Sequence, residues 1–179
     1  MSKKVLVFGA STSSKSINKQ LAQYAASLLE GVELNQIDLN DFDMPVFNVD
    51  REETNGIPEQ AYAFKNAIKQ ADGIIISFAE HNGAYAAAYK NIFDWVSRIE
   101  KEFWYNKPML LMATSPGPRG AKSVLEIATK AYSRVNKNVV SGFSLPSFYD
   151  HFDSETGLKD MQLKQDLQQL VEAFKLKFV

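Results

Sequence analysis

A serine-rich segment near the start of the chain is the first place where side chains could do chemistry. Residues 9–18 read Gly-Ala-Ser-Thr-Ser-Ser-Lys-Ser-Ile-Asn, and a helical pattern begins near Ser16. Free backbone N–H groups at a helix N-terminus, hydroxyl donors and the charge of Lys15 can together bind a phosphate group. The segment lacks the glycine patterns of dinucleotide and nucleoside triphosphate sites, which favours a phosphate monoester. A loop that merely caps the helix is the alternative.

A second candidate segment, residues 79–83, reads Ala-Glu-His-Asn-Gly and follows the apolar run from Gly73 to Phe78. Its side chains and backbone groups could hold a planar ring and contact the polar atoms at the edge of that ring. A simple turn explains the same composition equally well. His81 could also serve as a general base because its reference pKa lies near neutrality, but the sequence provides no fixed serine or carboxylate partner for it.

A third segment, Ser-Pro-Gly-Pro-Arg-Gly at residues 115–120, follows the apolar run 108–113. It is not a nucleotide phosphate loop, because Ala121 stands where that motif has glycine before its lysine. We interpret the segment as a rigid wall beside a bound ring. Arg119 is most simply solvated, although its guanidinium could contact the phosphate of a nicotinamide nucleotide.

The order of elements along the chain predicts how these segments meet. Apolar runs typical of strands alternate five times with helices whose apolar residues recur every three or four positions. The expected strands span residues 5–8, 32–39, 73–78, 108–113 and 139–143, helices begin near residues 16, 58, 85, 124 and 163, and residues 40–57 and 144–158 have loop composition. This alternation predicts an α/β fold with a doubly wound five-stranded parallel sheet, order 2-1-3-4-5, and helices on both faces. Ligands bind outside the carboxyl ends of such strands, where the three segments lie.

Length and composition limit the class of protein. The chain has 179 residues, 45% hydrophobic and 23% charged, which suits one domain spanning residues 1–179. A net charge of −1 without a basic cluster argues against a nucleic-acid partner. The absence of cysteine excludes disulfides, thiolate nucleophiles and sulfur-ligated metals, and we expect no metal site. Since the apolar run after Lys4 is too short for a signal peptide or a membrane span, we expect a cytoplasmic protein without a membrane partner.

Three motifs at these places resemble those of a known family. Its first pattern, Gly-Ser-x-Arg-x-x-Ser-x-Asn, is matched at Ser11, Ser16 and Asn18. The second and more specific pattern, Pro-Glu-Tyr-Asn-Gly followed by Lys-Asn-x-x-Asp-Trp, is matched at Glu80, Asn82, Gly83, Lys90, Asn91, Asp94 and Trp95. The third, Ser-Pro-Gly, stands at residues 115–117. From Val5 to Gly120 the chain therefore resembles the NAD(P)H-dependent FMN reductase family, a flavodoxin-like group that includes quinone, azo-dye and chromate reductases.

Three positions depart from the patterns of that family. Ser13 replaces the usual arginine and so removes a cation from the implied phosphate site. Ala79 replaces the usual proline, and His81 the usual tyrosine. A histidine at that position would change how the flavin ring packs, so substrate preference does not carry over from the family.

The resemblance implies an FMN-dependent oxidoreductase. NADPH or NADH would reduce the flavin, which would pass electrons to a small-molecule acceptor such as a flavin, a quinone, an azo compound or a metal oxyanion by ping-pong exchange. No catalytic side chain is assigned, because hydride transfer requires the reacting atoms to be positioned and no proton to be moved. The implied cofactor-binding residues are Ser11, Ser13, Ser16, Ile17 and Asn18 at the ribityl phosphate, Ala79, Glu80, His81, Asn82 and Gly83 at the ring edge, and Ser115 and Gly117 at its flank.

The resemblance also implies a homodimer or a dimer of dimers. A stretch rich in aromatic residues contains more of them than one helix needs for its core: Tyr85, Tyr89, Phe93, Trp95, Phe103, Trp104 and Tyr105. This surplus favours a subunit contact, and core packing is the alternative.

Two other functions remain open. A flavodoxin-type electron carrier would bind FMN without nicotinamide turnover, but carriers of that type resemble strongly acidic proteins, and a net charge of −1 disfavours it. A flavin-free binding or regulatory domain is the second alternative, because a fold does not fix a function.

Overall fold

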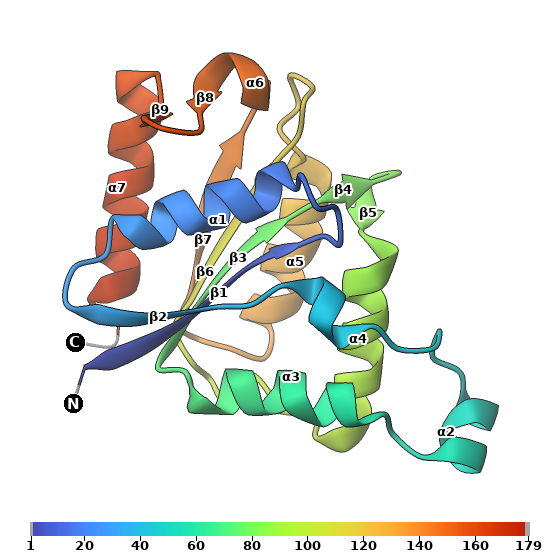
Figure 1. Ribbon diagram of the computed structural model, residues 1–179. Coiled ribbons are helices and arrows are strands. Elements are labelled where there is room, and N and C mark those ends of the chain that lie inside the picture. The colour runs from blue at the N-terminus through green and yellow to red at the C-terminus, as the bar shows by residue number, and fades with distance from the viewer. Residues whose placement is uncertain (1, 178–179) are drawn as a thin grey trace.

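The computed structural model describes residues 2–177, whose main sheet has five strands (Figure 1). These strands are β1 (Lys3–Ala10), β2 (Val32–Gln36), β3 (Gly73–Phe78), β6 (Met109–Thr114) and β7 (Val139–Leu145). All neighbouring pairs are parallel, and the strands lie in the order β2-β1-β3-β6-β7. The predicted α/β fold and the 2-1-3-4-5 strand order are therefore confirmed.

Helices cover both faces of this sheet (Figure 1). One face carries α1 (Ile17–Ser27) and α7 (Met161–Lys175), and the other carries α3 (Glu59–Gln70), α4 (Ala87–Ile99) and α5 (Lys122–Ser133). Along β1, Val5 and Val7 enter the first core, while Leu6 and Phe8 enter the second. Because β3 and β6 are buried on both faces, they lack the polar alternation of half-exposed strands and appear in the sequence as continuous apolar runs.

Segments with loop composition contain short elements that their sequence pattern does not predict. They are η1 (Leu39–Phe42), α2 (Val49–Asn55), α6 (Phe148–His151), β8 (Phe152–Asp153) and β9 (Gly157–Leu158). The helix α2 buries no side chain and stands away from the sheet (Figure 1), so it has no apolar stripe to reveal it. It is stabilised by the Asn48 side chain, which caps its N-terminus, and by the ion pair between Arg98 and Glu52 at 2.9 Å. No helix within residues 2–177 is long and apolar enough to cross a bilayer.

The edge strand β7 contains a bulge. Its pairing with β6 shifts between Leu111 and Met112, whose partners are Ser141 and Phe143, so that Gly142 is left over. Gly142 has a φ of 133°, and an extra residue of this kind bends and twists a strand. The glycine that weakened the strand prediction therefore marks a bulge within one continuous strand.

The aromatic-rich stretch lies mostly inside this single chain. Tyr89, Trp95, Phe103 and Trp104 are at most 4% exposed and belong to the core between the sheet and its α3–α5 face. The rings of Phe93 and Trp104 stack with their centroids 6.4 Å apart. Core packing accounts for these residues, so their number alone does not indicate a partner subunit.

Gly9 brings β1 and α1 into direct contact. A Cβ atom at Gly9 would lie 2.4 Å from the backbone nitrogen of Lys19 and 2.7 Å from its Cα atom. Backbone atoms cannot rotate away as the end of a flexible side chain can, so this approach requires glycine. The first turns of α1 are thereby held beside the carboxyl end of β1.

Replacing Gly9 by alanine is expected to lower the free energy of unfolding by about 2 kcal/mol, because the helix must shift away from the strand. Urea unfolding followed by circular dichroism measures the change. Gly117→Ala is the matched control, since a Cβ there meets no atom within 4 Å. Equal stability of the two variants would show that α1 can move without cost.

Candidate functional site

Three loops meet at the carboxyl end of the sheet, following β1, β3 and β6, and enclose a cavity of about 210 Å³. The cavity is lined by Ser11, Ser13, Lys15, Ser16, Ile17, Asn18, Ala79, Glu80, His81, Thr114, Ser115, Pro116 and Tyr149. The sequence predicts a site at the ends of its first, third and fourth strands, and the cavity lies at that place.

The loop after β1 presents hydrogen-bond donors to this cavity. The Ser16 side chain accepts a hydrogen bond from the Lys19 N–H at 3.1 Å and so caps α1. The backbone N–H groups of Ile17 and Asn18 lie in the first helical turn, where no intrahelical acceptor exists. The same wall also carries the side chains of Ser11, Ser13 and Lys15. Unpaired N–H groups, the positive end of the helix dipole and a lysine together make an anion-binding site.

Asn18 is 3% exposed and fixes this loop in place. Its Oδ1 atom accepts hydrogen bonds from the Ser77 hydroxyl at 2.7 Å and from the Thr114 N–H at 3.0 Å. Its Nδ2 atom donates to the Thr114 carbonyl oxygen at 3.1 Å. One side chain therefore joins the first turn of α1 to the carboxyl ends of β3 and β6, and we assign the Asn18 side chain to positioning the loop.

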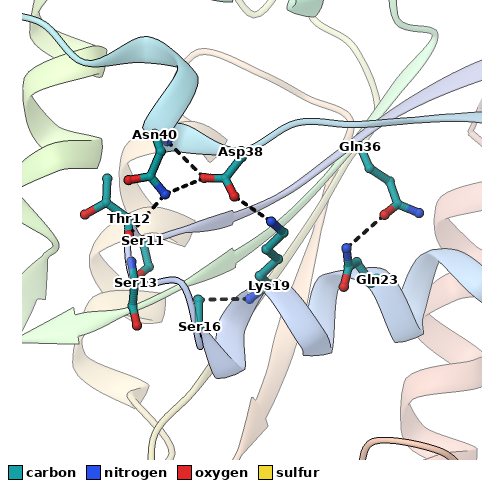
Figure 2. Close-up of polar contacts among 9 residues, drawn as sticks. All are labelled: Ser11, Thr12, Ser13, Ser16, Lys19, Gln23, Gln36, Asp38 and Asn40. Carbon is teal, nitrogen blue, oxygen red and sulfur yellow. Dashed lines mark hydrogen bonds and ion pairs between the residues drawn. The ribbon is translucent and has the colours of Figure 1, made fainter.

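A second polar network supports the loop from the side of β2 (Figure 2). Lys19 Nζ donates to Asp38 at 2.5 Å, while Asn40 Nδ2 donates to Asp38 at 2.7 Å and to the Thr12 carbonyl oxygen at 3.1 Å. The hydrogen bond from Lys19, followed by that from the Asn40 backbone, lowers the pKa of the Asp38 carboxyl. Because Lys19 is paired with Asp38, the lysine that the loop offers to a ligand is Lys15.

The loop after β3 forms a β-hairpin of β4 (Glu80–His81) and β5 (Ala84–Tyr85). Its turn residues Asn82 and Gly83 have φ values of 52° and 75°, as a two-residue type I′ turn requires. Both lie at the tip of the hairpin and do not line the cavity. The turn interpretation of this segment is thus correct for Asn82 and Gly83, and their contact with a cofactor stays a prediction.

Glu80 connects this hairpin to α5. Its Oε2 atom accepts a hydrogen bond from the Val124 N–H at 2.9 Å, in the first turn of that helix. The residue before α5 is Ala121, which has a φ of 58° and no side chain that could cap the helix. A carboxylate at a helix N-terminus supplies the missing acceptor and a favourable charge. The Glu80 side chain therefore holds the hairpin against α5.

Three tyrosines lie next to the hairpin and carry no charge at neutral pH. The hydroxyls of Tyr89 and Tyr132 form a hydrogen bond, and the rings of Tyr85 and Tyr89 are 5.4 Å apart. Burial raises the pKa of Tyr85 to about 12, and burial likewise raises the pKa of Tyr89 and of Tyr132. These phenols therefore support the hairpin without adding charge to the site.

The helix motif Lys-Asn-x-x-Asp-Trp holds the loop after β2. Asn91 accepts a hydrogen bond from the Phe47 N–H at 2.8 Å, and the Trp95 indole donates to the Pro45 carbonyl oxygen at 2.7 Å. Lys90 and Asp94 of the same motif form an ion pair along the helix at 2.6 Å. None of these four motif residues lines the cavity, so their role in this chain is structural.

The loop after β6 is tied to the segment that follows β7. The Gly117 carbonyl oxygen accepts a hydrogen bond from the Ser147 N–H at 2.9 Å, and the Ser115 carbonyl oxygen accepts one from the Phe148 N–H at 3.1 Å. Gly117 itself does not line the cavity, whereas Ser115 and Pro116 do. The wall predicted at residues 115–120 is thus built from two segments that are distant in the sequence.

The structure brings together all predicted site residues except Asn82, Gly83 and Gly117. Thr114, Pro116 and Tyr149 also line the cavity, although the sequence did not assign them. Thr114 ends an apolar strand directly before Ser115, so its position is a signal that sequence reasoning can use. Tyr149 lies in a segment with loop composition, where no pattern points to it.

The donor set fits a phosphate-bearing cofactor such as FMN. Hydroxyls, first-turn N–H groups and Lys15 share one wall of the cavity. Sites for drug-sized ligands enclose roughly 300–1,000 Å³. A cavity of about 210 Å³ is smaller, so it suits a phosphate and the chain next to it, with a flat ring at the rim. Within residues 2–177 no group of three or more His, Cys, Asp or Glu side chains could hold a metal ion.

The fold and this cavity define a flavodoxin-like α/β protein with a phosphate-binding end. Residues 3–150 match the model of the family described as NADPH-dependent FMN reductase. The chain therefore belongs to the NADPH-dependent FMN reductase family, and the predicted class of oxidoreductase is confirmed.

Relatives carry names that agree with this class. The NADPH:quinone oxidoreductase of Arabidopsis thaliana is 30% identical over 156 residues, which cover 82% of this chain and 76% of that protein. The probable NADPH:quinone oxidoreductase 1 of Oryza sativa subsp. japonica is 28% identical over 176 residues, covering 90% and 86%. Among solved structures, the flavoenzyme NAD(P)H:(acceptor) oxidoreductase FerB of Paracoccus denitrificans has a TM-score of 0.80 at 25% identity, covering 98% of this chain and 97% of its own.

Asn18→Ala is expected to lower the free energy of unfolding by about 2–3 kcal/mol without any ligand, because buried groups of Thr114 and Ser77 lose their partner. Ser77→Ala removes one of these hydrogen bonds and is the matched control, with an expected loss of about 1 kcal/mol. Urea unfolding of both variants makes the comparison. A loss no larger for Asn18→Ala than for Ser77→Ala contradicts the positioning role.

The stability of the loop network should depend on pH through Asp38. The folded pKa lies below the model value of 3.8, so the stabilisation is complete above about pH 4 and is lost as the pH falls through the folded value. Since the side chains of Lys19 and Asp38 are 36% and 33% exposed, the effect is at most about 1 kcal/mol. The measurement is the difference in unfolding free energy between the wild type and Asp38→Asn from pH 7 downward. A difference that does not shrink below pH 4 refutes the assignment.

Proposed function

We propose that the protein is an FMN-dependent NAD(P)H oxidoreductase that reduces a small-molecule acceptor of the quinone or flavin type. The observation that carries the proposal is the cavity at the ends of β1, β3 and β6, whose wall combines the N-terminus of α1 with serine hydroxyls and Lys15. Membership of the FMN reductase family and the likeness to proteins named NADPH:quinone oxidoreductase support it.

The cofactor would bind in two parts. Its phosphate would be held by the hydroxyls of Ser11, Ser13 and Ser16, the backbone N–H groups of Ile17 and Asn18, and the ammonium group of Lys15. Its ring would lie at the rim, with its edge along residues 79–83 and its flank at Ser115 and Gly117. This division follows from the size of the cavity, which is too small for the whole cofactor.

FMN supplies the redox chemistry when bound, accepting a hydride from a nicotinamide and delivering electrons to an acceptor. The residues of this chain would position the reacting atoms about 3–3.5 Å apart. Because one face of a ring held at the rim is open to both substrates, they would bind in turn, which gives ping-pong exchange. No side chain is required to move a proton in the hydride step. The Glu80 carboxylate accepts from the Val124 N–H, and His81 lies exposed at the rim, where it would contact the ring or the acceptor.

A flavodoxin-type electron carrier is the main alternative. It would use the same phosphate-binding end and would not react with a nicotinamide nucleotide. Carriers dock through strongly acidic surfaces, whereas this chain has a net charge of −1. The names of its relatives also favour nicotinamide-dependent turnover.

Two further expectations belong to this proposal. A homodimer or a dimer of dimers would cover the open side of the rim, although the buried aromatic residues give no support to it. The physiological place of action would be the cytoplasm, where NADPH and NADH are available.

Purified protein mixed with FMN should become yellow, and the colour should bleach under anaerobic conditions when NADPH or NADH is added. Adding a quinone should then restore the colour. Comparing the two nucleotides gives the preferred donor, and a panel of quinones, flavins and azo compounds gives the acceptor. FMN that binds but is bleached by neither nucleotide favours the electron carrier, and failure to bind FMN overturns the proposed function.

A further inference from the structure

One residue of the cavity wall comes from none of the three loops. Tyr149 belongs to α6, which follows β7, and it lines the cavity together with Lys15, Ser16 and Pro116. Its side chain is 66% exposed, which makes it one of the most exposed large side chains among residues 2–177. An exposed aromatic residue at the mouth of a polar cavity can contact whatever enters it.

The turn that carries Tyr149 is held rigidly. Ser147 precedes it with φ 43° and ψ 57°, a left-handed conformation that residues other than glycine rarely adopt. Two backbone hydrogen bonds hold this conformation, from Ser147 N–H to the Gly117 carbonyl oxygen and from Phe148 N–H to the Ser115 carbonyl oxygen. Strain of this kind persists only where the surroundings enforce it, and it concentrates at ligand sites.

Two buried rings anchor the same turn. Phe148 and Phe152 are 3% and 8% exposed, and their rings stack with centroids 4.7 Å apart. The ring of Tyr149 meets Phe148 edge-on at 5.6 Å. The two phenylalanines point into the core while the tyrosine stays at the cavity, so Tyr149 is presented from a fixed base.

The cavity has few positive charges for the anion that its donors suit. A phosphate monoester carries about −1.5 to −2 charges at pH 7. Among the described residues that line the cavity, Lys15 is the one lysine or arginine, and Glu80 adds a negative charge to the wall. Arg119 donates to the Ser123 hydroxyl at 2.9 Å and does not line the cavity. Neutral donors must therefore satisfy much of the phosphate, and a phenol hydroxyl is a suitable donor to a charged oxygen.

We propose that the Tyr149 hydroxyl donates a hydrogen bond to the phosphate of bound FMN and so makes the site select FMN over riboflavin. The inference rests on the proposed function, because it concerns the same cofactor. It deepens that function by adding a specificity-determining residue from a segment outside the three loops.

The test compares FMN with riboflavin, which lacks the phosphate. Dissociation constants are measured by titration of flavin fluorescence for the wild type, Tyr149→Phe and Lys15→Gln. Tyr149→Phe keeps the ring and removes the hydroxyl, so FMN binding should weaken about tenfold while riboflavin binding changes by less than about twofold. Lys15→Gln should show the same selectivity, because it removes the cation of the phosphate end. Tyr62→Phe is the control, since Tyr62 is a 45% exposed tyrosine that does not line the cavity.

Each outcome decides the proposal. An equal loss of FMN and riboflavin affinity in Tyr149→Phe overturns the contact with phosphate. Unchanged FMN affinity together with a raised KM for NADPH also overturns it and assigns Tyr149 to the nucleotide. If Lys15→Gln is selective and Tyr149→Phe is not, this inference fails while the proposed function stands. If the wild type binds no FMN, both fail.

Discussion

The buried side chain of Asn18 is the interaction on which the candidate site depends. A carboxamide offers an acceptor and a donor side by side, and in Asn18 they bond to the N–H and the carbonyl oxygen of the same residue, Thr114, while Ser77 bonds to the acceptor. A carboxylate could not donate, and an aliphatic side chain could do neither, so other side chains of this size leave buried groups unsatisfied. Gly9 is the complementary requirement, because the absence of a Cβ lets α1 approach closely enough for Asn18 to reach both strands. Together they place the helix N-terminus at the centre of the sheet edge.

The site residues divide into those that hold the loops and those that face the cavity. Asn18 and Glu80 both match the family patterns, and both use their side chains to bond with the protein. Asn91 and Trp95 similarly anchor the loop after β2 from α4. The cavity side is left to residues at which the chain departs from the family patterns, Ser13, Ala79 and His81. The motifs therefore establish the shape of the site, and the departures set the chemistry that its ligand meets.

The sequence predicts the fold well because the central strands are buried on both faces and the helices carry regular apolar stripes. It predicts the loops that form the cavity for the same reason, since each of them ends an apolar run. It does not predict α2 or α6, which are short and take their stability from caps and backbone hydrogen bonds, interactions that leave no periodic pattern. It also does not reveal that Asn18 and Glu80 bond to the protein, because their partners, Thr114 and Val124, are distant in the sequence. Tyr149 is missed because its place depends on the bonds between residues 115–117 and 147–148.

The bulge at Gly142 has a consequence for the behaviour of the protein at high concentration. Because β7 pairs on one side with β6, its other side presents free backbone groups, and a flat strand in that position is a template for joining sheets of different molecules. The extra residue interrupts the regular spacing of those groups and twists the edge, so an incoming strand could match it over only part of its length. A glycine that looks like a defect in the strand thus protects the molecule against fibril-like association.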